Sequence, residues 1–568
     1  MILNQFLPPE ILQKTLTKET FQDLDFILDV LDKDKKIPIF KNNELLGNIH
    51  HAINLDRYSK KSFRKILVSF APDQIKNKYF KLFGIKKNVS SMTKKELMNN
   101  ISKTSNFNWG NNEETKKFVS FFNYPEYIIP KNSTKNKVKE IIYGGIETKN
   151  NFKPLDLILD YQSKIVFKTL RELEFPNVRL LIQMPTGTGK TRTAMEILAH
   201  VLNKKKGQQI VWLTDSSELL TQAADAFKKN WVHVGKYPIE LYRIWGKGEI
   251  PKIKNENTII FAGYDKLNSL LKKSKTILSP DLVILDEAHR ILAPTYKHAL
   301  NTIRASGDDV QVIGLTATPG RGLDEEQNNL LVETFRNRII SIELDNSKDI
   351  ESYEDNIVEY LEDYGVLSKA IPEPLETDLE YDISEEEWRK LSALYVDDDN
   401  EYTPKFLKKM ANDNKRNILI IEKLKEYAEN GKKILYFSVD LEQSVLIFAA
   451  LLKLGINVVH ISGKTDKEFR SQVIEKFKDS NKIQIICNYN IFSTGFDVPK
   501  LDVVFIGRPV NSPVLFNQIV GRGTRGKVMG GENTFRLVQV IDKITTGDKK
   551  FDPYRHYSFW DKNWKLEK

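Results

Sequence analysis

The sequence predicts an α/β protein with two parallel-sheet lobes in series and a mainly helical N-terminal accessory domain. Three observations lead to this prediction. Short apolar segments alternate with helical segments from about residue 151, and a second alternating series begins at Lys433. The first 150 residues show helical periodicity without this alternation. Alternation of strand and helix is typical of a parallel sheet with helices on both faces.

The N-terminal region contains one clear helix start. Residues 93–96 are Thr-Lys-Lys-Glu, and Leu97 and Met98 follow. Threonine and glutamate at this spacing form a capping box, in which each side chain accepts a hydrogen bond from the other residue's backbone N–H. A helix is therefore expected to begin after Thr93.

Each lobe is expected to have its strands at the short apolar segments. The expected strands are 210–213, 258–262, 282–285 and 310–315 in the first lobe, and 434–437, 458–461, 483–487, 503–506 and 537–541 in the second. Residues 301–400 hold 26 Asp and Glu against 8 Lys and Arg, which favours a connector or insertion between the lobes. The expected division is an accessory domain over 1–150, a first lobe over 151–322, an acidic connector over 323–410, a second lobe over 411–545 and a tail over 546–568.

A glycine-rich loop stands between an apolar segment and a helical one. Residues 184–191 are Met-Pro-Thr-Gly-Thr-Gly-Lys-Thr. In such a loop, backbone N–H groups surround the β-phosphate, Lys190 reaches the β- and γ-phosphate oxygens, and Thr191 offers a hydroxyl to Mg²⁺. Met184 stands where the usual pattern begins with glycine, which is sterically acceptable if its φ is negative.

Two carboxylates follow the apolar segment 282–285. Asp286 and Glu287 would lie at the carboxyl end of a strand and point into the same crevice as the glycine-rich loop. Asp286 is the candidate Mg²⁺ ligand, and Glu287 is the candidate base that orients an attacking water. Together and in this order, the two motifs predict hydrolysis of a nucleoside triphosphate.

Further motifs occur in a characteristic order along the chain. They are Tyr161-Gln162, Trp212–Asp215 with Gln222, Thr316–Pro319, Tyr436–Ser438, Ser493–Pro499 and Gln518–Arg525. In this order the chain resembles a superfamily 2 helicase over roughly residues 155–545, and segment 518–525 contains the family's Gln-x-x-Gly-Arg-x-x-Arg pattern. The resemblance implies two RecA-like lobes with ATP between them, and ATP and Mg²⁺ as cofactors.

The resemblance also implies roles for individual residues. The expected nucleotide-binding residues are Gln162, Thr186, Gly187, Thr188, Gly189, Lys190, Thr191, His289, Gly495, Asp497 and Gln518. Those expected to contact nucleic acid, or to couple it to the ATP site, are Thr214, Gln222, Thr316, Thr318, Ser438 and Thr494. Arg522 and Arg525 are three residues apart, so on a helix both would project from one face toward the charge that develops on the transferring γ-phosphate. They are expected to reach it only when the lobes close.

Three segments point to a branch of this superfamily. Asp286–Arg290, Gly495–Pro499 and Arg508-Pro509 resemble restriction-enzyme motor subunits and related bacterial repair helicases. That group mostly translocates on duplex DNA, which implies DNA rather than RNA as the partner and a role in genome maintenance or in defence against foreign DNA. An RNA helicase or remodeller, and an ATP-switched binding module in a larger complex, are the alternatives. A small-molecule kinase would not explain the second-lobe arginines.

The net charge of +10 lies entirely in the N-terminal region. Residues 1–150 hold 26 Lys and Arg against 16 Asp and Glu, whereas the other 418 residues hold 60 of each. Within residues 51–100, 12 basic and 3 acidic side chains are interleaved with Tyr58, Phe63, Phe70, Tyr79, Phe80 and Phe83. This mixture favours nucleic-acid binding through counterion release and base stacking. The alternative is a lysine-rich surface over an aromatic core, in a domain that docks a protein partner.

Composition also narrows the protein class. Because no apolar stretch of about eighteen residues occurs, no membrane association is expected, and a cytoplasmic location is predicted. The single cysteine, Cys487, excludes an intrachain disulfide and is expected to be a small core residue. The tail from Phe551, with Trp560 and Trp564, is expected to dock on the second lobe or on a partner protein.

Overall fold

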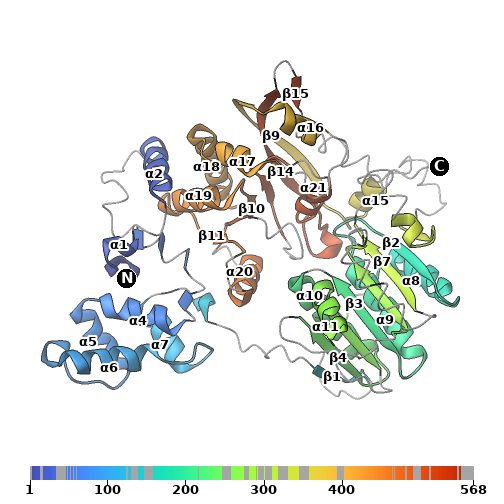
Figure 1. Ribbon diagram of the computed structural model, residues 1–568, viewed down its shortest axis with the longest axis horizontal. Helices are drawn as coiled ribbons and strands as arrows, with labels where there is room; N and C mark the ends of the chain where they lie inside the picture. The colour runs from blue at the N-terminus through green and yellow to red at the C-terminus, as the bar shows by residue number, and fades with distance from the viewer. Residues whose placement is uncertain are drawn as a thin grey trace.

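The computed structural model contains two sheet-based lobes and a helical N-terminal domain (Figure 1). The described residues are 3–12, 17–32, 46–47, 49–50, 53–54, 57–58, 60–122, 124, 126–129, 139–145, 158–214, 216–245, 257–273, 280–288, 291, 300, 310–317, 331–343, 357–392, 402–463, 465, 467–479, 483–489, 500–510, 513–546 and 549–551. Of the predicted tail over 546–568, only residues 546 and 549–551 are among them, and they belong to strands of the second lobe.

The first lobe is built on an eight-stranded sheet with the order β1-β4-β5-β3-β6-β7-β2-β8. Its strands are β1 (Lys139–Ile142), β2 (Arg179–Gln183), β3 (Gln209–Thr214), β4 (Ile239–Ile244), β5 (Thr258–Gly263), β6 (Leu282–Asp286), β7 (Gln311–Thr316) and β8 (Ile339–Ser341). Only β1 is antiparallel to its neighbour in this sheet. The carboxyl ends of the seven parallel strands therefore share one edge, which is where α/β proteins bind ligands.

Helices cover both faces of this sheet, as the sequence predicts. One face packs against α8 (Asp160–Glu172), α9 (Lys190–Lys204) and α10 (Ser217–Val234), and the other packs against α11 (Tyr264–Lys273). Successive residues of a strand point to opposite faces, so Leu180 and Ile182 of β2 join one apolar cluster and Leu181 joins the other. Burial on both faces explains why these strands are almost continuously apolar.

The second lobe has a seven-stranded sheet with the path β11-β12-β10-β13-β14-β15, and β9 also pairs with β14. Its strands are β9 (Lys369–Asp382), β10 (Ile434–Phe437), β11 (Val458–Ile461), β12 (Ile485–Asn488), β13 (Val503–Ile506), β14 (Thr534–Thr546) and β15 (Lys549–Phe551). Its helices include α17 (Pro404–Ala411), α18 (Asn414–Glu429), α19 (Leu441–Lys453), α20 (Lys467–Asp479) and α21 (Pro513–Val520). The predicted fold class of two parallel-sheet lobes is confirmed.

The interior of the second lobe contains one buried ion pair and the only cysteine. Arg416 and Asp542 both have fully buried side chains, and their closest nitrogen–oxygen distance is 3.0 Å. The same guanidinium donates a hydrogen bond of 2.6 Å to the backbone oxygen of Gly507, so this pair joins α18 to β14 and to the end of β13. Cys487 is fully buried on β12, as predicted.

Residues of the predicted acidic connector contribute to both lobes. β8 completes the first sheet, and α15 (Ile357–Asp363) packs into the apolar core of the first lobe. β9 runs parallel to β14 in the second sheet. Most acidic residues of β9 are at exposed positions. Because its acidic composition resembles that of a connector, this strand was not predicted from the sequence.

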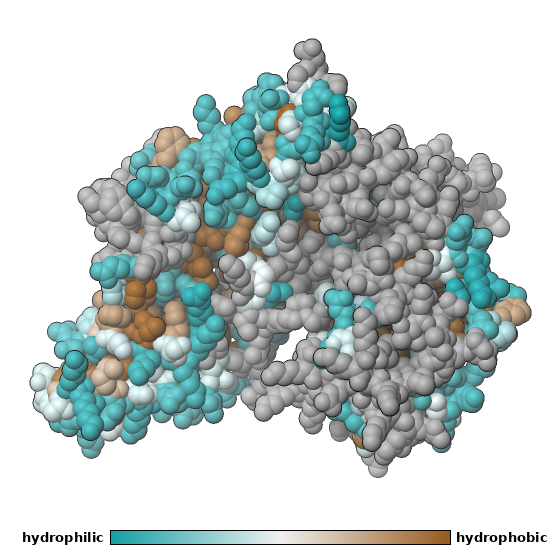
Figure 2. All heavy atoms as spheres, viewed as in Figure 1, coloured by the Kyte–Doolittle hydropathy of each residue, from teal (hydrophilic) through white to brown (hydrophobic). Residues whose placement is uncertain are grey.

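The N-terminal domain packs on the second lobe at two places. Its helices include α2 (Lys18–Leu31), α4 (Lys61–Phe70), α5 (Asp73–Leu82), α6 (Lys94–Ser105) and α7 (Glu113–Phe121). α2 contacts α18 and α19. Asn414 donates a hydrogen bond of 2.8 Å to Asp23, and Lys453 lies 3.3 Å from Asp32. A short helix, η5 (Glu126–Ile128), contacts α20. Hydrophobic residues gather between this domain and the second lobe, and hydrophilic ones cover much of its outer surface (Figure 2).

The inside of the helical domain is aromatic. Tyr58, Tyr79 and Phe80 are fully buried, so these three rings form core rather than a stacking surface. Arg64 is also fully buried and donates hydrogen bonds to the backbone oxygens of Ser105 and Phe107 at 3.2 and 2.6 Å. The predicted capping box is confirmed, because Thr93 caps α6 together with Glu96.

The next strand after these helices belongs to the first lobe. β1 lies within the predicted accessory domain but pairs with β4. Lys139 and Glu240 form an ion pair at 2.5 Å, and Glu140 pairs with Lys228 of α10 at 2.5 Å. Within the described part of the chain, no helix combines the length and apolar character needed to cross a bilayer.

A nucleotide-site candidate between the two lobes

The glycine-rich loop connects β2 to α9 at the carboxyl edge of the first sheet. Gly187 and Gly189 have φ values of 91° and 85°, which side chains disfavour, and α9 begins directly after Gly189. Met184 is buried and is not among the residues with positive φ, so the condition for replacing glycine there is met. The loop backbone and the first turn of α9 therefore face one cavity, as phosphate binding requires.

Lys190 projects from this loop toward the two carboxylates. Its Nζ donates to the backbone oxygen of Met184 at 3.4 Å. Burial lowers the pKa of Lys190 from its ordinary value, whereas the charges of Glu287 and Asp286 act to raise it and Arg522 acts to lower it. Lys190, both carboxylates and Arg522 line the same cavity.

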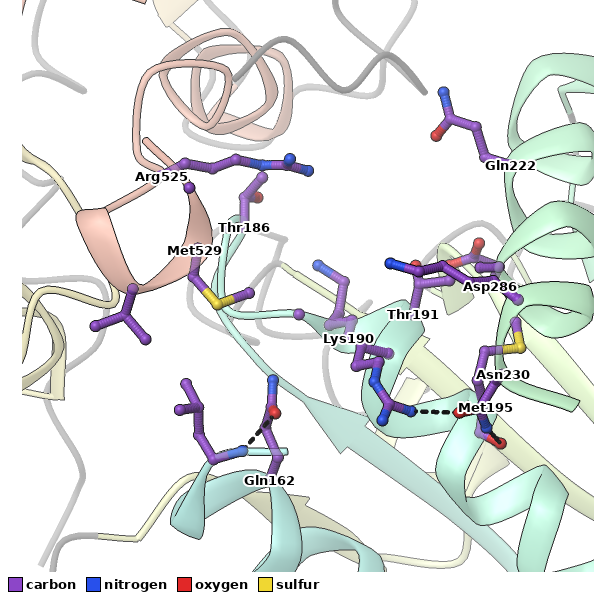
Figure 3. A pocket seen from close by; sticks show the side chains of 18 of the residues that line it. Gln162, Thr186, Lys190, Thr191, Met195, Gln222, Asn230, Asp286, Arg525 and Met529 are labelled. Atoms are coloured by element: carbon purple, nitrogen blue, oxygen red, sulfur yellow. Dashed lines mark hydrogen bonds between the residues drawn. The ribbon is translucent and has the colours of Figure 1, made fainter. Parts of the chain in front are cut away.

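Asp286 ends β6, and Glu287 directly follows it. Asp286 is 8% exposed and accepts a hydrogen bond of 3.1 Å from the backbone N–H of Glu287. Glu287 has a φ of 52°, a left-handed conformation that is costly for a residue with a side chain and is found most often at functional sites. Thr191 and Asp286 both line the cavity (Figure 3).

Gln162 lies at the other end of the loop, on the first turn of α8. Its amide group donates to the backbone oxygen of Thr188 at 3.0 Å and accepts from the backbone N–H of Leu159 at 2.9 Å. Tyr161 also donates to the oxygen of Thr188, at 2.7 Å. The upstream Tyr-Gln pair is therefore bonded directly to the glycine-rich loop.

The second lobe closes this cavity from the opposite side. The cavity has a volume of about 710 Å³. Its walls include Leu159, Gln162, Thr186, Gly187, Gly189, Lys190, Thr191, Arg192, Gln222, Asn230, Asp286 and Glu287 from the first lobe, and Arg522, Arg525, Lys527, Val528, Met529 and Gly530 from the second. The lobes touch here, since the Thr524 hydroxyl lies 3.2 Å from the backbone oxygen of Thr186. A side chain at Gly521 would collide with Thr186, with its Cβ 2.4 Å from the Thr186 Cγ2.

The two arginines differ from expectation in their local structure. α21 ends at Val520, so Arg522 and Arg525 lie in the turns that follow it and not on a helix. Glycines at 521 and 523 allow close packing against Thr186 and Phe535, where a helical side chain would not fit. Arg525 instead forms a backbone bridge with Leu367, and its carbonyl accepts a hydrogen bond of 2.6 Å from Ser368. Both arginines nevertheless line the cavity.

The expected coupling residues are mostly buried. Thr214 and Thr316 are fully buried at strand ends, and Ser438 is 1% exposed and donates its hydroxyl hydrogen to Asn488 at 2.9 Å. Gln222 lines the same cavity as the glycine-rich loop, from the second turn of α10. Gln518 is not among the residues lining the cavity, and its carbonyl accepts from Arg522 at 3.2 Å. His289, Thr318, Thr494, Gly495 and Asp497 lie outside the described residues.

Other residues of the cavity were not expected from the sequence. Arg192 bonds to Asn230 of α10 at 2.8 Å, and Asn230 donates to the backbone oxygen of Met195 at 3.1 Å (Figure 3). Residues 527–530 belong to none of the sequence motifs, so no local pattern predicted that this turn lines the cavity. Arg192 directly follows Thr191, and its position in the first turn of α9 was the one available hint.

Fold and site together define a P-loop protein with a nucleotide-site candidate between two parallel-sheet lobes. Residues 157–321 match the family model described as type III restriction enzyme, res subunit, and residues 415–527 match the helicase conserved C-terminal domain. These two matches confirm the resemblance to superfamily 2 helicases and translocases that was found in the motifs.

Two curated relatives and one solved structure illustrate the similarity. A 51.5 kDa protein of a Lactococcus phage is 27% identical over 61% of this chain and 62% of its own length. The endonuclease subunit of the type I restriction enzyme EcoKI of Escherichia coli is 24% identical over 68% of this chain and 34% of its own. The type ISP restriction-modification enzyme LlaBIII bound to DNA has a TM-score of 0.48 at 16% identity, covering 72% of this chain and 30% of that one. The chain thus spans less than two thirds of each.

Proposed function

We propose that this protein is an ATP-hydrolysing motor that translocates on duplex DNA or unwinds it, in genome maintenance or in defence against foreign DNA. One observation carries the proposal: a single cavity joins the glycine-rich loop and Asp286–Glu287 of the first lobe to Arg522 and Arg525 of the second. A nucleotide held there contacts both lobes, so its hydrolysis changes their relative position. A nucleotide switch without hydrolysis would not need arginines at the phosphate end.

In this proposal each charged group of the cavity has a distinct task. The loop N–H groups and Lys190 bind the β- and γ-phosphates, and Glu287 orients the attacking water. Arg522 and Arg525 stabilise the charge that develops on the γ-phosphate. Thr191 and Asp286 would hold Mg²⁺, which neutralises phosphate charge when bound. They fit this ion because a hydroxyl and a carboxylate, both ligands of Mg²⁺, line the same cavity (Figure 3).

DNA is favoured over RNA by the proteins that this chain resembles. A restriction endonuclease subunit is among its relatives, and the family model of its first lobe describes a restriction-enzyme subunit. The alternatives of an RNA helicase and of an ATP-switched module remain as outcomes of the test below.

We expect duplex DNA to stimulate ATP hydrolysis by the purified full-length protein more strongly than RNA of the same length and sequence. Turnover is measured with duplex DNA, single-stranded DNA, duplex RNA and single-stranded RNA at one salt concentration, because nucleic-acid affinity depends steeply on salt. Stimulation by RNA alone would support the RNA helicase. Nucleotide binding without turnover under any of these conditions would support the switch.

We further propose that the N-terminal domain adds a nucleic-acid contact to the motor. A cavity of about 580 Å³ on this domain is lined by Lys61, Phe83, Lys103, Asn106, Phe107, Asn108, Asn112 and Glu114. Lys61 and Lys103 are exposed at its edge, beside the half-buried ring of Phe83. Arg64 holds one wall, because it bonds to the backbone oxygens of Ser105 and Phe107. Two ammonium groups around an aromatic ring suit a phosphate backbone with an accessible base.

Replacing Lys61 and Lys103 together with glutamine is expected to weaken DNA binding and to lower the slope of log affinity against log salt by about one to two, since each lost phosphate contact contributes about 0.9. Binding is measured by titration over a range of salt concentrations. Lys405 and Lys409, exposed on α17, supply a control double variant with the same charge change. Equal slopes for both variants would favour a domain that docks a protein. Deletion of residues 1–150 is the weaker test, because it uncovers α18 and α19 and removes β1 from the first sheet.

A further inference from the structure

A short turn of the second lobe lies over the glycine-rich loop of the first. It contains the helix η8 (Lys527–Met529) and ends at Gly530, whose φ is 84°. Its backbone is fixed by the connector between the lobes, because Gly526 donates to the oxygen of Val366 at 2.9 Å and Val528 donates to that of Gly365 at 3.0 Å. Val366 is buried in the core of the first lobe. The turn is therefore held in place from both lobes.

Met529 is the side chain of this turn that reaches the loop. It is half-buried and packs against the apolar core of the first lobe. A Cβ added at Gly189 would lie 3.2 Å from the methyl carbon of Met529 and 2.5 Å from Nε2 of Gln162. The methyl group and the amide thus meet at Gly189 from opposite lobes, and Figure 3 shows both beside the space in front of Lys190.

The chemistry of this end of the cavity differs from that of the phosphate end. Lys190, Asp286, Glu287 and the two arginines gather at the phosphate end, whereas Leu159, Val528 and Met529 are apolar and Gln162 supplies an amide. An amide can bond to the edge of a flat heterocycle, and an apolar side chain can cover its face. Methionine suits that contact, since its polarisable thioether and methyl groups pack well on aromatic rings.

We propose that Met529 packs on the base of the bound nucleotide and is a base-binding residue of the second lobe. This inference rests on the proposed nucleotide site. It makes the base, as well as the γ-phosphate, a link between the lobes: the first lobe holds the base edge through Gln162, and the second lobe covers its face through Met529. A nucleotide without γ-phosphate would then still contact both lobes.

The test separates base binding from phosphate binding. Dissociation constants are measured by calorimetry for ADP, which has a base, and for inorganic tripolyphosphate, which has none. Met529→Ala is expected to weaken ADP binding about tenfold, which corresponds to about 1.4 kcal/mol of lost apolar contact with the base, and to leave tripolyphosphate binding unchanged. Met529→Leu retains an apolar side chain of similar size and is expected to restore ADP binding to within about twofold.

Ile371→Ala is a matched control, because Ile371 is 40% exposed on β9 of the same lobe and does not line the cavity. Equal weakening of ADP and tripolyphosphate by Met529→Ala would show that Met529 only positions the loop, which overturns the proposal. Unchanged ADP binding would overturn it too. If the wild-type protein binds neither ligand, the nucleotide site itself is wrong, and that failure is distinct from the other two.

Discussion

Lys190→Ala is expected to lower ATP turnover at least about a thousandfold, because the variant loses a cation that binds the β- and γ-phosphates and neutralises their charge in the transition state. The structure sharpens this expectation. Asp286 and Glu287 are close enough to Lys190 to act on its pKa, so without the ammonium group these carboxylates would face the triphosphate with less opposing charge. Turnover is measured by phosphate release from purified protein. Lys204→Ala, at the far end of the same helix, is the control and is expected to retain wild-type turnover.

Glu287→Gln separates the chemical step from binding in the same experiment. Glutamine has nearly the same shape and can occupy the same strained backbone position, but it cannot serve as a base. The variant is expected to bind ATP with an affinity close to that of the wild type and to hydrolyse it slowly. Wild-type turnover in either Lys190→Ala or Glu287→Gln would contradict the assignment of these residues.

Arg522→Ala and Arg525→Ala are each expected to lower turnover by about a hundredfold to a thousandfold, and to weaken ATP binding much less. The reason is that both side chains come from the second lobe and act on charge that develops during the reaction. Turnover and nucleotide affinity are measured separately for each variant. Arg389→Ala is the control, since that side chain is 78% exposed on α16 (Glu385–Ser392).

Lysine replacements distinguish charge from geometry at these two positions. Lysine keeps the charge but cannot form paired hydrogen bonds to phosphate oxygens, so Arg522→Lys and Arg525→Lys are expected to recover turnover only in part. A loss of ATP affinity as large as the loss of turnover would show that the arginines bind ATP before the reaction begins. Such a result would contradict a role in stabilising the transition state.

The strands that the sequence predicted are those whose residues are mostly apolar and carry no charge. β4 was missed because it contains Glu240 and Arg243, which are buried at 6% and 4% exposure and satisfied by ion pairs to Lys139 and Glu140 of β1. Partners about a hundred residues away in sequence cannot be recognised from a local pattern. β9 was missed for a related reason, since Pro372, Pro374 and several acidic residues hide a strand whose pairing comes from β14.

The site residues that the sequence predicted correctly belong to short motifs, each within one loop or at the end of one strand. Lys190, Thr191 and Asp286 belong to such motifs, and the structure brings them into one cavity. Met529 and Asn230 reach that cavity through tertiary packing alone. In the basic, aromatic N-terminal segment, composition alone does not reveal which aromatic side chains are buried. Tyr79 is buried, whereas Phe70 is 44% exposed.

The position of the N-terminal domain has a mechanical consequence. Its helices α2 and η5 are attached to the second lobe, whereas β1, which follows in the chain, is a strand of the first lobe. If the lobes move relative to each other, α2 and η5 move with the second lobe and β1 moves with the first. A ligand bound to those two helices would therefore change its distance from the first lobe whenever the lobes move.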